Sequence, residues 1–216
     1  MRNCRDDNQA RPRSSESRGT NRTEIFQVQQ DSVIKNDQTY EFLGNDVSCN
    51  LGSTNVVNLM ASPDFGKSVK VMLRALTYVT DTSDIDVVPS VKKGNEMYHS
   101  VGLGAMNLHG FLAKNKIHYG SPESLEFVDV YFMLLNYWTL VESCNIAKER
   151  GETFYEFEKS KYADGSYFDM YLNTPEFEFK HDKVKELFEG IFIPKHEDWR
   201  KLKEDVMKYG LYNALT

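Results

Sequence analysis

The stretch YHSVGLGAMNLHGF, residues 98–111, decides the fold class of this chain. It predicts a buried strand that passes into a helix around Met106. Upstream, residues 23–29 (TEIFQVQ) and 40–49 (YEFLGNDVSC) carry β-branched and aromatic side chains, which predicts two earlier strands joined by a loop. Because strands and helices alternate along the chain, the sequence indicates an α/β fold.

Two similar helix starts flank this stretch. Residues 62–64 (SPD) and 121–123 (SPE) each combine an N-cap serine, a proline at the first helical position and an acid in the first turn. The first helix is expected to bury an apolar face made of Val69, Val71, Met72, Ala75, Leu76 and Val79. The second runs to Arg150, where Gly151 stops it, and is apolar nearly all round, so it belongs inside a larger body.

Shorter elements complete the prediction. Residues 85–89 (IDVVP) are expected to be extended and to end at the proline. Helical patterns follow at residues 153–160, 182–189 and 196–209, and Gly210 closes the last of them.

The composition describes an acidic globular protein. The chain has 216 residues, of which 40% are hydrophobic and 27% charged, and its net charge is -6. This charge disfavours generic binding to nucleic-acid phosphates or to an anionic membrane. No apolar run reaches the ~18 residues of a membrane span, and no apolar stretch at the start resembles a signal peptide. We therefore expect no direct DNA binding, no membrane association and no export.

Cysteine and histidine spacing points away from disulfide scaffolds and metal sites. Cys4, Cys49 and Cys144 are widely spaced and odd in number, which favours a reducing cytoplasmic location. The five histidines never occur in a metal-ligand spacing, so no metal site is predicted.

Residues 1–22 differ from the rest of the chain. They hold six of the nine arginines, no lysine and almost no apolar side chain, so they cannot build a core. A nucleic-acid-binding tail is one interpretation, although the segment has no aromatic residue to stack on a base. We favour a disordered basic arm that is not native to the domain formed by residues 23–216.

Cys49 and Glu24 are candidate reactive residues, and each also has a simpler structural interpretation. Cys49 ends a predicted strand and precedes the turn-like residues 50–53, and a buried cysteine that packs as a small hydrophobic residue is the simpler interpretation. Glu24 lies at the start of the first predicted strand, where acids are depleted, and taken alone it would be a surface charge.

The central stretch holds weaker signals. His109 lies in an apolar segment, which favours a hydrogen-bonded core histidine over a ligand or base. Gly102 and Gly104 suggest a phosphate loop, but Asn107 replaces the third glycine of the dinucleotide fingerprint. Close packing of a strand against a helix explains these glycines at least as well.

Four motifs in order resemble a known family. They are TEI at 23–25 with Gln27 and Gln29, VSCNLGS at 47–53, VGLGAMNLHG at 101–110 and NIAKERG at 145–151. Together they resemble the catalytic large subunit of class I ribonucleotide reductase, most closely class Ib. The resemblance covers about residues 23–213 of the sequence.

The resemblance implies a fold and two site residues. The family fold is a ten-stranded α/β barrel with a finger loop that carries a thiyl radical, so this chain is expected to form part of such a barrel. Glu24 matches the active-site glutamate, which accepts a proton from the ribose 3'-hydroxyl. Cys49 matches one of two reducing cysteines, which end as a disulfide.

The fingertip departs from the family pattern. Thr20, Asn21, Arg22, Thr23 and Glu24 occupy its substrate-binding positions, and Arg22 stands where the family has its radical cysteine. Arginine has no thiol hydrogen to abstract, so we expect an internal fragment of a large subunit that is inactive alone. The alternative is a non-catalytic fragment or interaction module that associates with other reductase subunits.

The resemblance also implies partners. These are a ribonucleoside diphosphate substrate, the radical-generating small subunit, a reductant similar to thioredoxin or glutaredoxin, and the missing segments of the large subunit. No cofactor is expected in this chain, because the family relies on a dimetal-tyrosyl radical in the small subunit.

Overall fold

The computed structural model describes residues 33–34, 40–42 and 46–215. The arm at residues 1–22 and the predicted strand at residues 23–29 therefore lie outside the described residues. The first two described elements, β1 (Val33–Ile34) and β2 (Tyr40–Phe42), pair in antiparallel orientation.

A strand, helix, strand unit forms the centre of the fold. Strands β3 (Asn50–Asn55) and β4 (Val101–Met106) pair in parallel, with Asn50 opposite Val101 and Asn55 opposite Met106. The connection between them contains α2 (Val56–Met60), α3 (Phe65–Thr82) and α4 (Pro89–Tyr98). Parallel strands need a crossover of this kind. The predicted α/β class and the passage from strand to helix after Met106 are confirmed.

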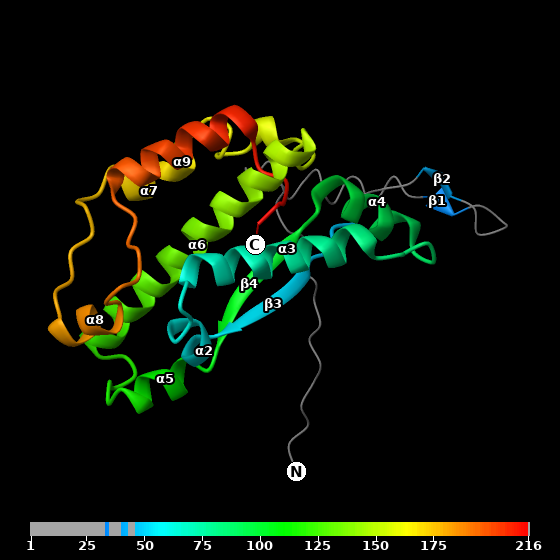
Figure 1. Ribbon diagram of the computed structural model, residues 1–216. Coiled ribbons are helices and arrows are strands. Elements are labelled where there is room, and N and C mark those ends of the chain that lie inside the picture. Colours follow the sequence, from blue (N-terminus) through cyan, green and yellow to red (C-terminus); the bar gives the residue numbers. More distant parts are fainter. Residues whose placement is uncertain (1–32, 35–39, 43–45, 216) are drawn as a thin grey trace, which may run out of the picture.

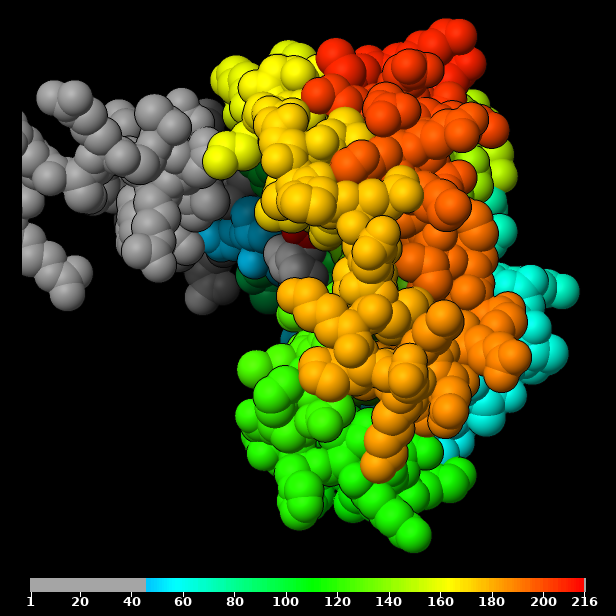
Figure 2. Space-filling model, turned by 90° about the vertical axis from the view of Figure 1, so that its left-hand side faces the viewer, coloured from blue at the N-terminus to red at the C-terminus, as the bar shows by residue number. Residues whose placement is uncertain are grey.

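The second half of the chain is helical. It contains α5 (Leu108–Lys114), α6 (Pro122–Arg150), η1 (Phe157–Lys159), η2 (Ser166–Phe168), α7 (Asp169–Leu172), α8 (Asp182–Leu187) and α9 (His196–Tyr209). Helix α6 packs against α3 and against α9, and lies between them (Figure 1). Figure 2 shows the yellow and orange segment between α6 and α9 spread over one side of the molecule. The predicted helix at residues 153–160 reduces to η1.

Helix α6 has the boundaries that the sequence predicts. The hydroxyl of Ser121 accepts the backbone N–H of Ser124 at 3.2 Å, and Gly151 ends the helix with a left-handed φ of 72°. Its side chains are buried on most sides, as an apolar helix inside a larger body requires. The ring of Phe127 is fully buried and stacks on Phe111 with 4.7 Å between ring centroids.

The boundaries predicted for residues 40–49 and 50–53 are wrong. Strand β2 is shorter than predicted, and the supposed turn is the beginning of β3, which starts at Asn50. Glycine serves packing here rather than a turn: a Cβ at Gly52 would lie 3.1 Å from Leu76 Cδ1. The missing side chain lets α3 approach the strand closely.

Two further local predictions are wrong. Helix α3 is capped by Asp64, whose carboxylate accepts the N–H of Lys67 at 2.8 Å, and Ser62 is not the N-cap. Residues 85–89 do not form an extended segment that ends at proline. Instead Pro89 opens α4, where its fixed φ and missing N–H are tolerated.

Helix α3 buries only part of the predicted face. Val69 is buried and Met72 and Leu76 are half-buried, but Val71 and Val79 are 56% and 48% exposed, and Ala75 is also exposed. The buried stripe also contains Leu73 and Thr77, which were not predicted. The cause is the contact with α6, which selects the face of α3 regardless of which stripe is most apolar.

The described ranges contain neither a helix that could span a membrane nor a cluster that could bind a metal ion. No helix there has both the length and the apolar character needed to cross a bilayer. No three His, Cys, Asp or Glu side chains of residues 33–34, 40–42 and 46–215 gather where they could hold a metal ion.

Candidate functional site

The parallel sheet has two unlike faces. Because side chains alternate along a strand, Asn50, Gly52 and Thr54 share one face with Val101 and Leu103 of β4. Helices α3 and α6 cover this face. One contact is the 2.8 Å hydrogen bond from Asn50 Nδ2 to Thr80 Oγ1 of α3, and another is the 2.7 Å bond between the hydroxyls of Thr54 and Tyr131 of α6.

The opposite face of the sheet is open to a ligand. Leu51 is 77% exposed, Ser53 is exposed and Met106 is 53% exposed. The register pairs Leu51 with Gly102, Ser53 with Gly104 and Asn55 with Met106, so two of the six positions on this face carry no side chain. Gly104 is half-buried and leaves the β4 backbone beside Ser53 accessible to a flat group, whereas Gly102, beside Leu51, is buried.

This arrangement corrects the packing role expected for Gly104. A Cβ at Gly104 would meet nothing closer than Ser53 Oγ at 3.8 Å, and it lies on the face away from the helices. Close strand-to-helix packing is the role of Gly52 instead. A phosphate loop is not formed by these glycines, because Gly104 lies within the paired strand β4.

Cys49 lies at the rim of the open face. It directly precedes β3, and continuing the strand alternation by one residue places it on the same side as Leu51. Cys49 is half-buried, is not in a disulfide, and its Sγ lies 3.9 Å from the carbonyl oxygen of Asn50. The neighbouring Ser48 Oγ is buried with no hydrogen-bond partner among the described residues, which marks a place where a further polar group is expected.

Cys144 provides an internal contrast. Its thiol on α6 is 2% exposed, and burial raises its pKa to about 11. A thiol of this kind is a poor nucleophile near neutral pH, because the thiolate is the reactive form. Of the two described cysteines, Cys49 is therefore the candidate for redox chemistry.

A buried asparagine supports the rim where Cys49 lies. Asn213 is fully buried, and its Nδ2 donates to the carbonyl of His99 at 3.0 Å and to Thr77 Oγ1 at 3.1 Å. Its Oδ1 accepts from Ser143 Oγ at 3.2 Å. The next residue after His99, Ser100, accepts the N–H of Asn50 at 3.1 Å. These bonds fix the start of both central strands.

A charged cluster flanks the asparagine. Asp81 accepts from the hydroxyl of Tyr212 at 3.0 Å and from Arg150 at 2.6 Å, and it lies 3.2 Å from His99 Nδ1. The rings of His99 and Tyr212 stack at 4.1 Å. Burial lowers the pKa of His99 despite the attraction of Asp81. Burial, aided by the hydrogen bond to Asp81, raises the pKa of Tyr212.

No pattern in the sequence predicts this cluster. Asp81, His99, Arg150 and Asn213 are far apart along the chain and show no ligand-like spacing. Only the fold brings them together. A weak signal exists at His99, which adopts the left-handed φ of 44° at the end of α4, a conformation in which histidine is enriched.

Several predicted site residues cannot be placed beside Cys49. Thr20, Asn21, Arg22, Thr23 and Glu24 all lie outside the described residues. Their convergence on the rim that Cys49 occupies stays a prediction.

His109 differs from its prediction. The side chain is exposed on α5 and makes an edge contact with Tyr119 at 6.0 Å between ring centroids. The expected core histidine is therefore wrong, because α5 turns this position away from the apolar contacts of Phe111 and Leu112.

A comparison with known protein families identifies the family of this chain. The sequence pattern described as "Ribonucleotide reductase, barrel domain" matches residues 8–216. The chain belongs to the ribonucleotide reductase family, and its mixed strands and helices are those of a partial α/β barrel. The match begins inside the segment 1–22, so the boundary placed at residue 22 stays a prediction.

Individual relatives are reductase alpha subunits. The chain is 45% identical over 192 residues to the ribonucleoside-diphosphate reductase subunit alpha of Bacillus subtilis. This alignment covers 89% of the present chain and 27% of the Bacillus subtilis protein. It is 45% identical over 194 residues to the nrdEB subunit alpha of Bacillus phage SPbeta, covering 90% and 18%. The subunit alpha of Mycoplasma pneumoniae is 42% identical over 197 residues, covering 89% and 27%. The chain thus spans 18–27% of the length of these relatives.

Proposed function

We propose that this chain is a section of a ribonucleoside-diphosphate reductase alpha subunit that supplies Cys49 and Glu24 to the active site of an assembled enzyme. The observation that carries the proposal is the position of Cys49, half-buried at the rim of the sheet face that the helices leave uncovered. The identity to reductase alpha subunits over most of the chain supports it.

The chemistry assigned to the two residues is complementary. Once a radical has removed the 3'-hydrogen of the ribose, Glu24 accepts the proton of the 3'-hydroxyl as a general base. Cys49 and a partner thiol together give two electrons and two protons. The 2'-hydroxyl leaves as water, a hydrogen takes its place on carbon 2', and the thiols become a disulfide.

Arg22 limits what the chain does alone. Because it stands at the position of the radical cysteine and offers no thiol hydrogen, the isolated chain is expected to be inactive. The same residue favours a second candidate function, a non-catalytic module that associates with other reductase subunits.

The proposal includes the partners of a complete enzyme. These are a ribonucleoside diphosphate, a small subunit carrying a dimetal-tyrosyl radical, a thioredoxin-like or glutaredoxin-like reductant, and the remaining segments of the large subunit. A cytoplasmic location suits the reduced state of Cys49 that the reaction requires. We place the basic arm at residues 1–22 outside the catalytic part, which begins at residue 23.

A chimera tests the function directly. The segment of the Bacillus subtilis alpha subunit that aligns with residues 23–216 is replaced by residues 23–216 of this chain, so that the host retains its own fingertip cysteine. With the host small subunit and thioredoxin, we expect formation of deoxyribonucleoside diphosphate from a labelled ribonucleoside diphosphate. Cys49→Ser should abolish turnover with thioredoxin, and Glu24→Gln should lower it by about 100-fold or more.

The matched control is Cys144→Ser, which changes the buried thiol and should keep turnover. Full turnover by Cys49→Ser would contradict the assignment. Turnover by the unaltered 216-residue chain alone would contradict the argument from Arg22. An inactive chimera with native stability would favour the non-catalytic candidate.

A further inference from the structure

The residue that follows Cys49 is anchored to two parts of the fold. The N–H of Asn50 donates to the carbonyl of Ser100 at 3.1 Å, and Asn50 Nδ2 donates to Thr80 Oγ1 of α3 at 2.8 Å. Ser100 and Thr80 are 1% and 0% exposed. One side of Cys49 is therefore fixed on buried groups.

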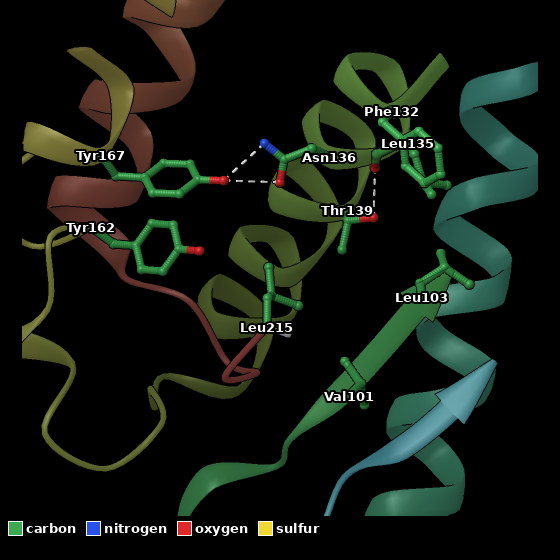
Figure 3. Close-up of a pocket in the computed structure, with 9 residues that line it drawn as sticks. All are labelled: Val101, Leu103, Phe132, Leu135, Asn136, Thr139, Tyr162, Tyr167 and Leu215. Atoms are coloured by element: carbon green, nitrogen blue, oxygen red, sulfur yellow. Dashed lines mark hydrogen bonds between the residues drawn. The ribbon is translucent and has the colours of Figure 1, made fainter. Parts of the chain in front are cut away.

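The strand behind this anchor is itself held by α6. Val101, directly after Ser100, is 1% exposed, and it lines a cavity of about 190 Å³ together with Leu103 and with Leu135 of α6 (Figure 3). Residues 101 and 103 share the covered face of β4. The anchor at Asn50 thus rests on a strand that packs into the interior, and the position of Cys49 is decided by the chain that precedes it.

The segment before Cys49 crosses one face of α4. The N–H of Asp46 donates to the carbonyl of Ser90 at 3.1 Å, and the Ser90 hydroxyl donates to the Asp46 carboxylate at 2.5 Å. A Cβ on Gly94 would lie 2.2 Å from the carbonyl oxygen of Asp46. Positions 90 and 94 are one helical turn apart and share a face. Asp46, Ser90 and Gly94 therefore form one contact, which we call the α4 clamp.

The start of α4 is suited to a carboxylate from another part of the chain. Its N-cap residue, Val88, makes no side-chain cap, and its first turn contains no acid. Because a helix N-terminus carries partial positive charge, Asp46 supplies a negative group that the helix lacks. Ser90 is 8% exposed, and low exposure to water strengthens its hydrogen bond to Asp46.

The chemistry proposed for Cys49 depends on its position. Cys49 and a partner thiol are oxidised to a disulfide as the ribose is reduced, and a disulfide requires Cβ atoms about 3.5–4.5 Å apart. Misplacement of reacting groups by about 1 Å can slow a reaction by about 100-fold. We propose that the α4 clamp positions Cys49, so that its three residues act on the reaction only through this thiol. The inference rests on the proposed function and adds positioning residues to it.

Alkylation of the 216-residue chain tests the clamp without turnover. Gly94→Ala must displace the Asp46 carbonyl by about 1 Å, because an ordinary C···O contact is about 3.3 Å. With its segment less firmly held, Cys49 should react with iodoacetamide about threefold faster or more. The buried Cys144, followed by mass spectrometry in the same sample, should keep its rate. Glu96→Ala, at an exposed position of α4, is the matched control and should change neither rate.

A second pair of variants leaves α4 unaltered. Asp46→Ala removes the acceptor of the Ser90 hydroxyl and should accelerate alkylation of Cys49 by about twofold or more. Asp46→Asn keeps an acceptor oxygen at the same place and should restore a rate within about 1.5-fold of the unaltered chain.

The chimera described above supplies a kinetic readout. Gly94→Ala in the chimera should lower kcat by about tenfold or more and leave KM for the ribonucleoside diphosphate within about twofold, because the clamp places the thiol and does not hold the substrate. Glu96→Ala should leave both constants unchanged.

Three results would overturn the proposal. The first is an unchanged alkylation rate of Cys49 in both Gly94→Ala and Asp46→Ala. The second is equal acceleration at Cys49 and Cys144 in both variants, which would indicate general opening of the fold. The third is a raised KM with an unchanged kcat in the chimera. Alkylation requires no substrate, so an inactive chimera whose Cys49 responds to the variants would reject the proposed function and still support the clamp.

Discussion

At the scale of the residue, His99 combines constraints that do not fit a surface histidine. It ends α4 in a left-handed conformation, stacks on Tyr212 and lies against Asp81. Its carbonyl meanwhile accepts from Asn213. Since burial opposes protonation more than Asp81 favours it, the pKa of His99 is lowered and the neutral ring is the form that the fold prefers.

This preference predicts acid sensitivity. The unfolded chain binds a proton at His99 more readily than the folded chain does, so stability is lost as the pH falls below the ordinary histidine pKa of about 6.5. His99→Asn retains a residue that tolerates positive φ and should flatten the fall in stability between pH 7 and pH 5, by up to about 1.4 kcal/mol per pH unit. Urea unfolding at a series of pH values measures it.

The exposed His109 offers the matched control for this experiment. His109→Asn should reproduce the pH dependence of the unaltered chain. If His99→Asn and the unaltered chain lose stability equally on acidification, burial of His99 is not the cause of the acid sensitivity.

At the scale of the element, the crossing of α3 and α6 depends on one glycine. A Cβ placed on Gly66 would lie 2.5 Å from Cε2 of Trp138, closer than real atoms approach. The indole is fixed by its neighbours: Lys70 lies over it at 5.3 Å, and Tyr137 packs edge-on at 5.1 Å. Glycine within the first turn of α3 therefore permits the close contact between the two helices.

Gly66→Ala should destabilise the chain by about 1–3 kcal/mol through this overlap, although alanine alone would favour the helix by about 1 kcal/mol. Lys67→Ala, on the exposed side of the same turn, should stay within about 0.5 kcal/mol. Thermal unfolding compares them. Trp138→Leu should rescue Gly66→Ala in the double variant, and a stabilised Gly66→Ala would rule out the overlap.

Helices α3 and α6 show which features of the fold can be predicted from the sequence and which cannot. Helix α6 could be predicted end to end, because Ser121 and Gly151 are local signals that need no tertiary partner. The buried face of α3 could not, because the choice of Leu73 over Val71 is made by the crossing with α6. Strand β3 was misjudged for a related reason: the glycine at position 52 serves packing against Leu76.

The residues of the candidate site also differ in whether the sequence could identify them. The redox role of Cys49 rests on a resemblance to a family and stays a prediction, while the structure shows its side chain half-buried at the strand rim. Asp81, His99 and Asn213 could not have been found, because their proximity results from contacts between elements. Whether Glu24 joins Cys49 at the rim remains a prediction.

At the scale of the whole molecule, residues 211–215 connect α3, α6 and, through the bond from Asn213 to the carbonyl of His99, the start of β4. Leu211, Tyr212 and Asn213 are buried. Asn213 joins α3 through Thr77 and α6 through Ser143. This short segment therefore stabilises contacts that the helices alone would not fix.

Asn213→Ala should lower the free energy of unfolding by about 1–3 kcal/mol, because the carbonyl of His99 loses its hydrogen bond, whereas Thr77 keeps its bond to Leu73 and Ser143 keeps the N–H of residue 213. Asn58→Ala, at an exposed position of α2, should change it by about 0.5 kcal/mol or less. Urea unfolding distinguishes them, and equal stability of the two variants would show that the asparagine is dispensable.

The hydrogen bonds of Asn213 also have a consequence for biosynthesis. They join Asn213 to Thr77, which lies 136 positions earlier in the sequence, and to Ser143, which lies 70 positions earlier. Contacts this distant in sequence form late and slowly. During translation, α3, β4 and α6 all emerge before the residue that joins them. The two central strands are therefore secured only after residue 213 has been synthesised, and until then the apolar surfaces of the nascent chain are exposed to aggregation.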